Sequence, residues 1–129
     1  MIESHSPRPS ALRPWTVTAI AFLFIAAGLL GVTHHATDMF SRGAFRLDEV
    51  WLVLIRSLAI VAGVFMLRRA DWARWLALAW LAYHVALSAF HSFSDTLIHG
   101  LLLAGIAFVL LHSASAAWFR GEAAEVPRQ

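Results

Sequence analysis

The sequence contains no cysteine and no lysine, and only 14% of its 129 residues are charged. The absence of cysteine excludes disulfides, thiolate metal ligands, iron–sulfur clusters and cysteine nucleophiles. Ten arginines stand against eight acidic residues, and no basic run is long enough to bind nucleic acid. The scarcity of charge, beside 60% apolar residues, departs from the composition of soluble domains, of which roughly a quarter of residues are charged. We therefore expect an integral membrane protein in contact with the lipid bilayer.

Four long apolar stretches follow a short N-terminal segment. Residues 1–14 hold three prolines among serines and predict a disordered arm. Each apolar stretch is long enough to cross about 30 Å of hydrocarbon at about 1.5 Å per residue. The expected transmembrane helices are about 15–32, 50–67, 72–90 and 96–117, in a domain of 15–119 that a tail of 120–129 follows.

The first stretch could also be compared with a cleavable signal peptide. Such a peptide has an apolar region of about 7–15 residues and a small-residue cleavage site. Residues 15–32 carry no charge over a longer run, and His34 and His35 follow them. We therefore expect a retained transmembrane helix.

The distribution of arginines predicts the orientation of the helices. With the N-terminus inside, the cytoplasmic segments hold seven arginines and the outer loops hold only Arg42 and Arg46. This bias follows the positive-inside rule. Tryptophans near the expected helix ends are typical of a membrane-interface belt: Trp15, Trp51, Trp72, Trp75 and Trp118. The fold class is thus predicted as all-α, an antiparallel up-down four-helix membrane bundle with both termini cytoplasmic.

The turn before the third stretch resembles a known pattern. Residues 67–76 read Leu-Arg-Arg-Ala-Asp-Trp-Ala-Arg-Trp-Leu, and Trp80 and His84 follow them. This segment, over roughly residues 60–92, resembles small uncharacterised four-span bacterial inner-membrane proteins in which a basic turn leads into a Trp-Ala-Arg-x-Leu helix start. The resemblance implies a location in the bacterial cytoplasmic membrane and carries no assigned chemistry.

Histidine is unusually frequent for a chain of this kind, with seven residues. The predicted topology brings several of them toward one outer rim, beside two aspartates. Imidazole and carboxylate are ligands that zinc, copper and iron accept. The hypothetical metal ligands are His34, His35, Asp38, His84, His91, Asp95 and His99.

His84 and His91 share one face of the third helix, because a seven-residue spacing leaves them about 20° apart around the axis. Such a polar stripe should point into the bundle rather than toward lipid. A single haem b held between His84 and a histidine of the first or fourth helix is one hypothesis for a cofactor, and a metal ion is another. The alternative is structural: rim imidazoles face water, and His84 hydrogen-bonds to a neighbouring helix.

Arg56 is the one charge inside the second predicted helix, about 9 Å from its outer end. An unpaired charge at that depth is costly, so we expect a partner for it. An anionic ligand, a lipid phosphate, Asp95, Asp38 or backbone carbonyls could provide that partner, or the side chain could snorkel toward the interface.

Small residues spaced by four, such as Ala27 with Gly31 and Gly100 with Ala104, predict close helix packing, more within the bundle than with another protein.

Three functions are consistent with these features. The first is a non-catalytic accessory or scaffold subunit that associates with other membrane proteins or with itself. The second is a redox or metal-handling protein that uses the outer histidine and aspartate cluster. The third is a small dimeric proton-coupled exporter, although the first helix lacks the carboxylate that such exporters carry. No HExxH motif or nucleophile elbow is present, so we expect no enzyme activity.

Overall fold

The structure, a computed structural model, describes residues 12–43 and 47–121. All of the regular structure in this part of the chain is helical. The helices are α1 (Trp15–Arg42), α2 (Leu47–Leu67), α3 (Asp71–Ser88), α4 (Phe93–Leu111) and α5 (Ser113–Arg120). The expected N-terminal arm up to residue 11 and the tail from residue 122 lie outside the described residues.

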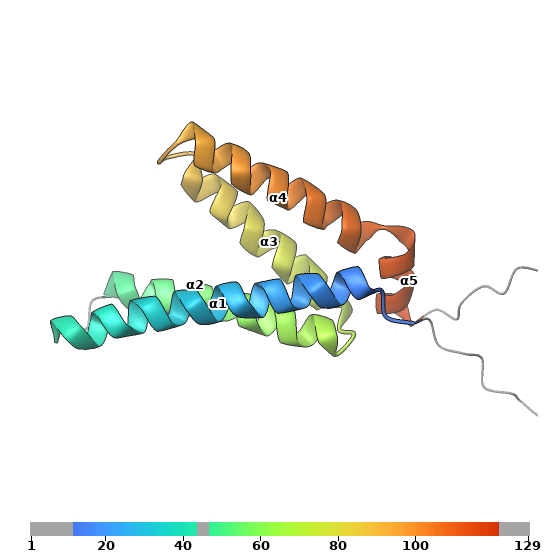
Figure 1. Ribbon diagram of the computed structural model, residues 1–129, viewed down its shortest axis with the longest axis horizontal. Coiled ribbons are helices and arrows are strands. Elements are labelled where there is room, and N and C mark those ends of the chain that lie inside the picture. The colour runs from blue at the N-terminus through green and yellow to red at the C-terminus, as the bar shows by residue number, and fades with distance from the viewer. Residues whose placement is uncertain (1–11, 44–46, 122–129) are drawn as a thin grey trace, which may run out of the picture.

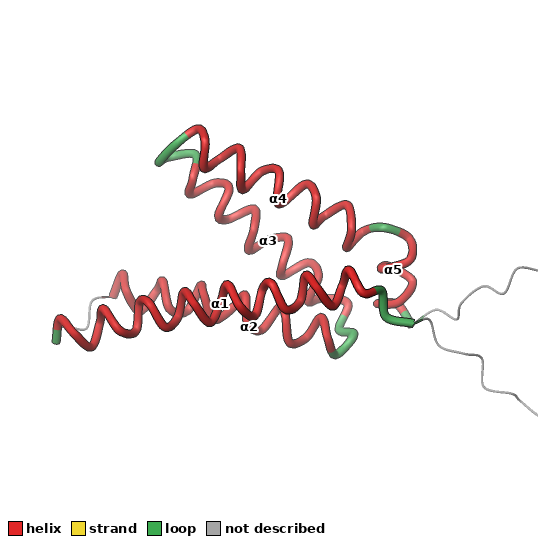
Figure 2. The backbone as a smooth tube through the Cα atoms, in the orientation of Figure 1, coloured by secondary structure: helices red, strands yellow, loops and turns green. Residues whose placement is uncertain are grey.

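The helices form two antiparallel pairs that meet near α5. Helices α1 and α2 run side by side, and α3 and α4 form a second hairpin that rises away from them with distance from α5 (Figure 1). The tube view shows the same divergence (Figure 2). The helices of each pair run antiparallel, but the two pairs do not close into a parallel-sided bundle.

Three of the helices in the described part are long and apolar enough to cross a membrane. They are Trp15–Ser41, Leu47–Leu67 and Phe93–Leu111. Helix α3 is not among them, because polar and charged residues dilute its alanines and leucines. Those residues are Asp71, Arg74, Tyr83, His84 and three tryptophans. The described chain thus shows an all-helical protein with three candidate spans, where the sequence predicted four.

Small residues let α1 and α2 approach closely. A Cβ atom on Gly28 would lie 2.9 Å from the carbonyl oxygen of Arg56 and 2.6 Å from the Ile60 side chain. A Cβ on Gly63 would lie 2.6 Å from the carbonyl oxygen of Ala21. Such close backbone contact is the usual role of small residues between membrane helices.

The buried core extends from this pair to α3, α4 and α5. Trp80 of α3 donates a hydrogen bond from Nε1 to the carbonyl oxygen of Ile55, at 2.7 Å, and packs against the ring of Phe24. The remaining core is mostly small or aliphatic and includes Ala59, Ala62, Met66, Ala73, Ala77, Leu81, Ile106 and Leu110. Alanine on the inner face of α3 lets that helix lie close to its neighbours.

Two helix ends differ most from the predicted ones, while α2 and α4 each begin three residues earlier than predicted. Helix α1 continues ten residues beyond 32, to Arg42, and ends at Gly43 in the left-handed conformation (φ 62°). The stretch expected as one helix over 96–117 is broken at His112, whose backbone is extended (ψ 146°). The residues after the break form α5, which buries Ser115, Ala116, Trp118 and Phe119.

Candidate functional site

The predicted histidine and aspartate cluster is divided between the two helix pairs. His34, His35 and Asp38 lie on the far part of α1, whereas His84, His91, Asp95 and His99 belong to the α3–α4 hairpin. Because the pairs diverge toward these ends, the structure does not bring the two groups together (Figure 1). Within residues 12–43 and 47–121, no three histidine, aspartate or glutamate side chains are placed to hold one metal ion.

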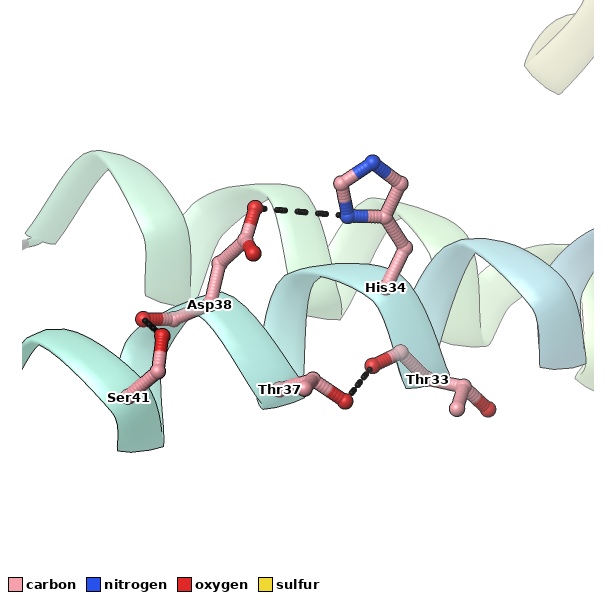
Figure 3. A network of polar contacts seen from close by, with 5 residues as sticks. All are labelled: Thr33, His34, Thr37, Asp38 and Ser41. Atoms are coloured by element: carbon pink, nitrogen blue, oxygen red, sulfur yellow. Dashed lines mark hydrogen bonds and ion pairs between the residues drawn. The ribbon is translucent and has the colours of Figure 1, made fainter.

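The α1 group is an exposed polar stretch of helix. His34 Nδ1 lies 3.3 Å from Asp38 Oδ2, and its ring stacks on that of His35 with 5.3 Å between centroids. The hydroxyl of Thr37 donates to the carbonyl oxygen of Thr33, and that of Ser41 to Asp38 (Figure 3). These own-helix bonds satisfy the polar side chains locally, in the part of α1 that lies beyond its apolar run.

Helices α3 and α4 bring two histidines together. The ring centroids of His84 and His99 are 6.3 Å apart, with 24° between the ring planes. The ring of Trp80 covers His84 at a centroid distance of 3.9 Å, and Tyr83 approaches it edge-on. His91 lies exposed in the turn between the two helices and has no such ring neighbour among the described residues.

The hydrogen bonds of these histidines define their tautomers. Nδ1 lies 2.9 Å from the carbonyl oxygen of Trp80 in His84, and 2.8 Å from that of Asp95 in His99. His91 makes the same bond to Leu87, at 2.9 Å. A carbonyl oxygen only accepts, so Nδ1 carries the proton in all three rings. In the neutral form, Nε2 of each ring then presents a lone pair.

Two contacts between α2 and α3 show which part of α2 lies beside His84. Trp80 is bonded to Ile55, and Trp51 Nε1 makes a long hydrogen bond of 3.4 Å to the hydroxyl of Tyr83. His84, next to Tyr83, therefore lies near the level of Trp51.

Arg56 lies against α1 rather than beside an acid. A Cβ on Gly31 would fall 2.6 Å from Arg56 Cδ and 3.1 Å from Nε, so the arginine stem occupies the space left by the missing side chain. In the described part of the chain, neither Asp38 nor Asp95, the predicted partners, forms an ion pair with it.

The opposite end of the molecule holds an arginine cluster that sequence reasoning missed. Arg69 Nε donates a 2.5 Å hydrogen bond to the carbonyl oxygen of Trp118, near the C-terminus of α5. Arg74 is only 6% exposed, pairs with Asp71 at 2.8 Å and lies over the ring of Phe119. These arginines attach α5 to the α2–α3 turn. The sequence signal for it is the basic turn, which predicted orientation and carried the resemblance to small four-span membrane proteins but indicated no contact with α5.

A pocket lies where α1 begins and α4 turns into α5. Its volume is about 170 Å³, and its lining is Pro14, Thr16, Phe108, Val109, His112, Ala114 and Ser115. Sites for small-molecule ligands usually measure about 300–1,000 Å³. This pocket is smaller than that, and its few polar groups do not form a catalytic arrangement.

Comparison of the chain with known protein families, curated proteins and solved structures finds no match. The resemblance to small four-span bacterial membrane proteins therefore stays a prediction.

Proposed function

We propose that this chain is a four-span protein of the bacterial cytoplasmic membrane that acts as a non-catalytic accessory or scaffold subunit, with both termini in the cytoplasm. The proposal combines three candidate spans with α3 as a fourth, shorter one. It assigns binding of another membrane protein to the surfaces that the chain leaves uncovered.

Helix α3 can lie in a membrane because its neighbours shield its polar residues. It has 18 residues, about 27 Å of helix, which is close to the hydrocarbon thickness. Asp71 and Arg74 pair with each other in its first turn, and Trp80 is bonded to α2. Its buried face, formed by Ala73, Ala77 and Leu81, packs inward.

The positions of the arginines support the proposed orientation. Arg13, Arg68, Arg69, Arg74 and Arg120 all lie at or near the end where α5 joins the two helix pairs. An end so rich in arginine is expected on the cytoplasmic side. Because the chain has no cysteine, single cysteines at exposed Ser41 and Ala114 would report opposite sides of the membrane to an impermeant thiol reagent.

The uncovered face of α4 is the observation that carries the accessory role. Only 11% of its most apolar window is buried within the chain. A Cβ on Gly100 or Gly105 would meet no atom within 4 Å. These glycines interrupt an exposed surface of Leu101, Phe108 and Leu111, and small residues on such a surface allow another membrane helix to approach closely.

The test replaces Gly100 and Gly105 together by leucine in the full chain. The variant should unfold at about the same temperature as the wild type, because among the described residues no atom lies within 4 Å of a Cβ placed at either position. It should lose the larger assembly that the wild type forms in native membranes, measured by native electrophoresis after mild-detergent extraction. Gly63→Leu is the matched control, since it should disturb the α1–α2 contact and lower the unfolding temperature. A wild type that migrates alone, or a double variant that keeps the assembly, would contradict the proposal.

A further inference from the structure

Two helices begin beside the pocket at the α5 end of the molecule, where the start of α1 lies next to α5 (Figure 1). The lining includes Pro14 and Thr16 from the start of α1, and Ala114 and Ser115 from the start of α5. The first amides of a helix have no carbonyl partner within it and carry a partial positive charge. Neither first turn contains an acidic residue, and Pro14 gives α1 no side-chain cap. Both helix ends at the pocket therefore favour an anion.

Two hydroxyl groups in the lining are not used by the fold. Ser115 is only 3% exposed, yet its hydroxyl makes no hydrogen bond within the described residues, and neither does that of Thr16. By contrast, the part-buried hydroxyls of Ser57 and Ser88 each bond to the carbonyl oxygen four residues earlier in their own helix. Leaving a buried hydroxyl without a partner costs free energy. A ligand that accepts hydrogen bonds would remove that cost at Ser115.

His112 adds a further donor to the lining. Its Nδ1 accepts a hydrogen bond from the amide of Ala114, at 3.4 Å, so the neutral ring carries its proton on Nε2. The three histidines of the α3–α4 hairpin have the opposite tautomer, because their Nδ1 atoms lie beside carbonyl oxygens. His112 can therefore cap α5 through one nitrogen and donate a hydrogen bond through the other.

Two arginines add full positive charges at this end of the molecule. Arg13 directly precedes Pro14 and lies over the ring of Trp118, with its guanidinium carbon 5.9 Å from the ring centroid. Arg69 lies at the same distance from that ring, and its Nη2 has no hydrogen-bond partner within the described residues. The guanidinium group matches phosphate because it can donate two parallel hydrogen bonds. Phosphate is therefore the anion that these side chains fit best.

Exposed apolar side chains border the same pocket. Phe108 lines it and is 73% exposed, and Trp15, next to Thr16, is 78% exposed. Both belong to helices that are candidate membrane spans, so acyl chains can cover them. The volume of about 170 Å³ gives room for a phosphate group but is below the usual size of a site for a whole small molecule. Phosphate in the pocket and hydrocarbon outside it describe a phospholipid.

We propose that this pocket binds the phosphate group of an anionic phospholipid through Thr16, Ser115 and Arg13, with acyl chains along Phe108 and Trp15. Basic pockets at the cytoplasmic ends of membrane helices hold anionic headgroups in this way. The proposal goes beyond the accessory role and requires only that α1 and α4 lie in a membrane. A free phosphate ion shares the same chemistry, and the experiment separates these two sources.

The binding experiment uses the full chain, delipidated in mild detergent, and counts bound phosphatidylglycerol and phosphatidylcholine by native mass spectrometry. The wild type should bind one phosphatidylglycerol in preference to phosphatidylcholine. Arg13→Gln, and Thr16→Val combined with Ser115→Ala, should each weaken that binding about tenfold, because each removes donors to the charged phosphate. Arg68→Gln is the matched control: it makes the same charge change at the same end, but Arg68 lies over Phe65 and should not affect binding.

Thermal unfolding of the lipid-free variants separates loss of the site from loss of fold. Thr16→Val and Ser115→Ala remove no hydrogen bond formed within the described residues, so this variant should unfold as the wild type does. Equal binding of the two lipids, or equal weakening by Arg68→Gln, would overturn the proposal. If inorganic phosphate raises the unfolding temperature while phosphatidylglycerol does not bind, the ligand is the free ion and the lipid is excluded.

Discussion

The side chain of Arg56 crosses α1 at Gly31, so that a methyl group at position 31 would lie 2.6 Å from its Cδ atom. This contact joins a glycine of α1 to the arginine inside the second predicted span. It is one of three glycine contacts between α1 and α2, and the three differ in what an added methyl would meet.

Alanine substitutions should distinguish these contacts. Gly28→Ala and Gly63→Ala place a methyl against the backbone of the facing helix, which cannot move locally, so each should lower the free energy of unfolding by about 1–3 kcal/mol. Gly31→Ala should have a smaller effect, because the arginine side chain can rotate away. Gly100→Ala, with open space around it, is the control and should raise the free energy of unfolding by about 0.5–1 kcal/mol, because alanine loses less backbone entropy than glycine in a helix. Denaturation in detergent micelles measures the free energy of unfolding of all four variants. Equal changes for Gly28→Ala and Gly100→Ala would mean that α1 and α2 do not approach closely at Gly28.

The hydrogen bond from Trp80 to Ile55 should stabilise the contact between the two helix pairs. Trp80→Phe keeps an aromatic ring beside Phe24 but leaves the Ile55 carbonyl without this donor. The expected loss is about 0.5–1.5 kcal/mol. Trp15→Phe, at a position that is 78% exposed, should have little effect on the same unfolding curve. If the two variants unfold alike, the α2–α3 contact does not depend on this bond.

Arg69 combines a left-handed backbone (φ 64°) with a hydrogen bond to the end of α5. Arg69→Ala and Arg69→Gly both remove that bond, but glycine adopts positive φ without the steric cost of a Cβ atom, about 1 kcal/mol. The glycine variant should therefore be the more stable of the two. In both, hydrogen exchange over residues 113–120 should become faster than in the wild type, while exchange in the middle of α2 stays unchanged. Unchanged exchange in α5 would mean that Arg69 does not hold it.

The sequence predicted the helical class and most of the helix positions, because long uncharged runs define segments that lipid can accept. It missed the extension of α1 because polar residues such as Thr37 and Ser41 satisfy their hydroxyls within the helix, so the apolar run ended before the helix did. It also missed the break at His112, where the imidazole accepts a hydrogen bond from the amide of Ala114 and caps α5.

The candidate site was predicted less completely, for a geometric reason. Residue spacing along a helix gives depth and facing direction, and it placed His84 and His91 on one face of the third helix. The structure brings the ring of His84 within 6.3 Å of that of His99, from the next helix. Spacing says nothing of the angle between two helix pairs. The divergence of the α3–α4 hairpin from α1 and α2 is what separates His34 and Asp38 from the other histidines, and no residue pattern signals it (Figure 1).

Replacing Arg56 by methionine tests how the chain tolerates a charge within α2. Methionine keeps an unbranched stem that can fill the space over Gly31, and it removes a charge whose burial in lipid costs about 3 kcal/mol or more. Because no carboxylate within the described residues forms an ion pair with Arg56, the isolated chain should become more stable in lipid bicelles. Arg56→Glu is the informative contrast, since it keeps a charge at the same depth and should be less stable than the methionine variant.

A methionine variant less stable than the wild type would mean that Arg56 is held by a counter-charge in the bilayer, such as a lipid phosphate. Comparing anionic with zwitterionic bicelles then shows whether that counter-charge comes from the lipid, because destabilisation by Arg56→Met should then depend on the lipid charge. Stabilisation by Arg56→Met in both lipids is the result expected from the geometry at Gly31, where the arginine is positioned by packing against a helix backbone rather than by an ion pair.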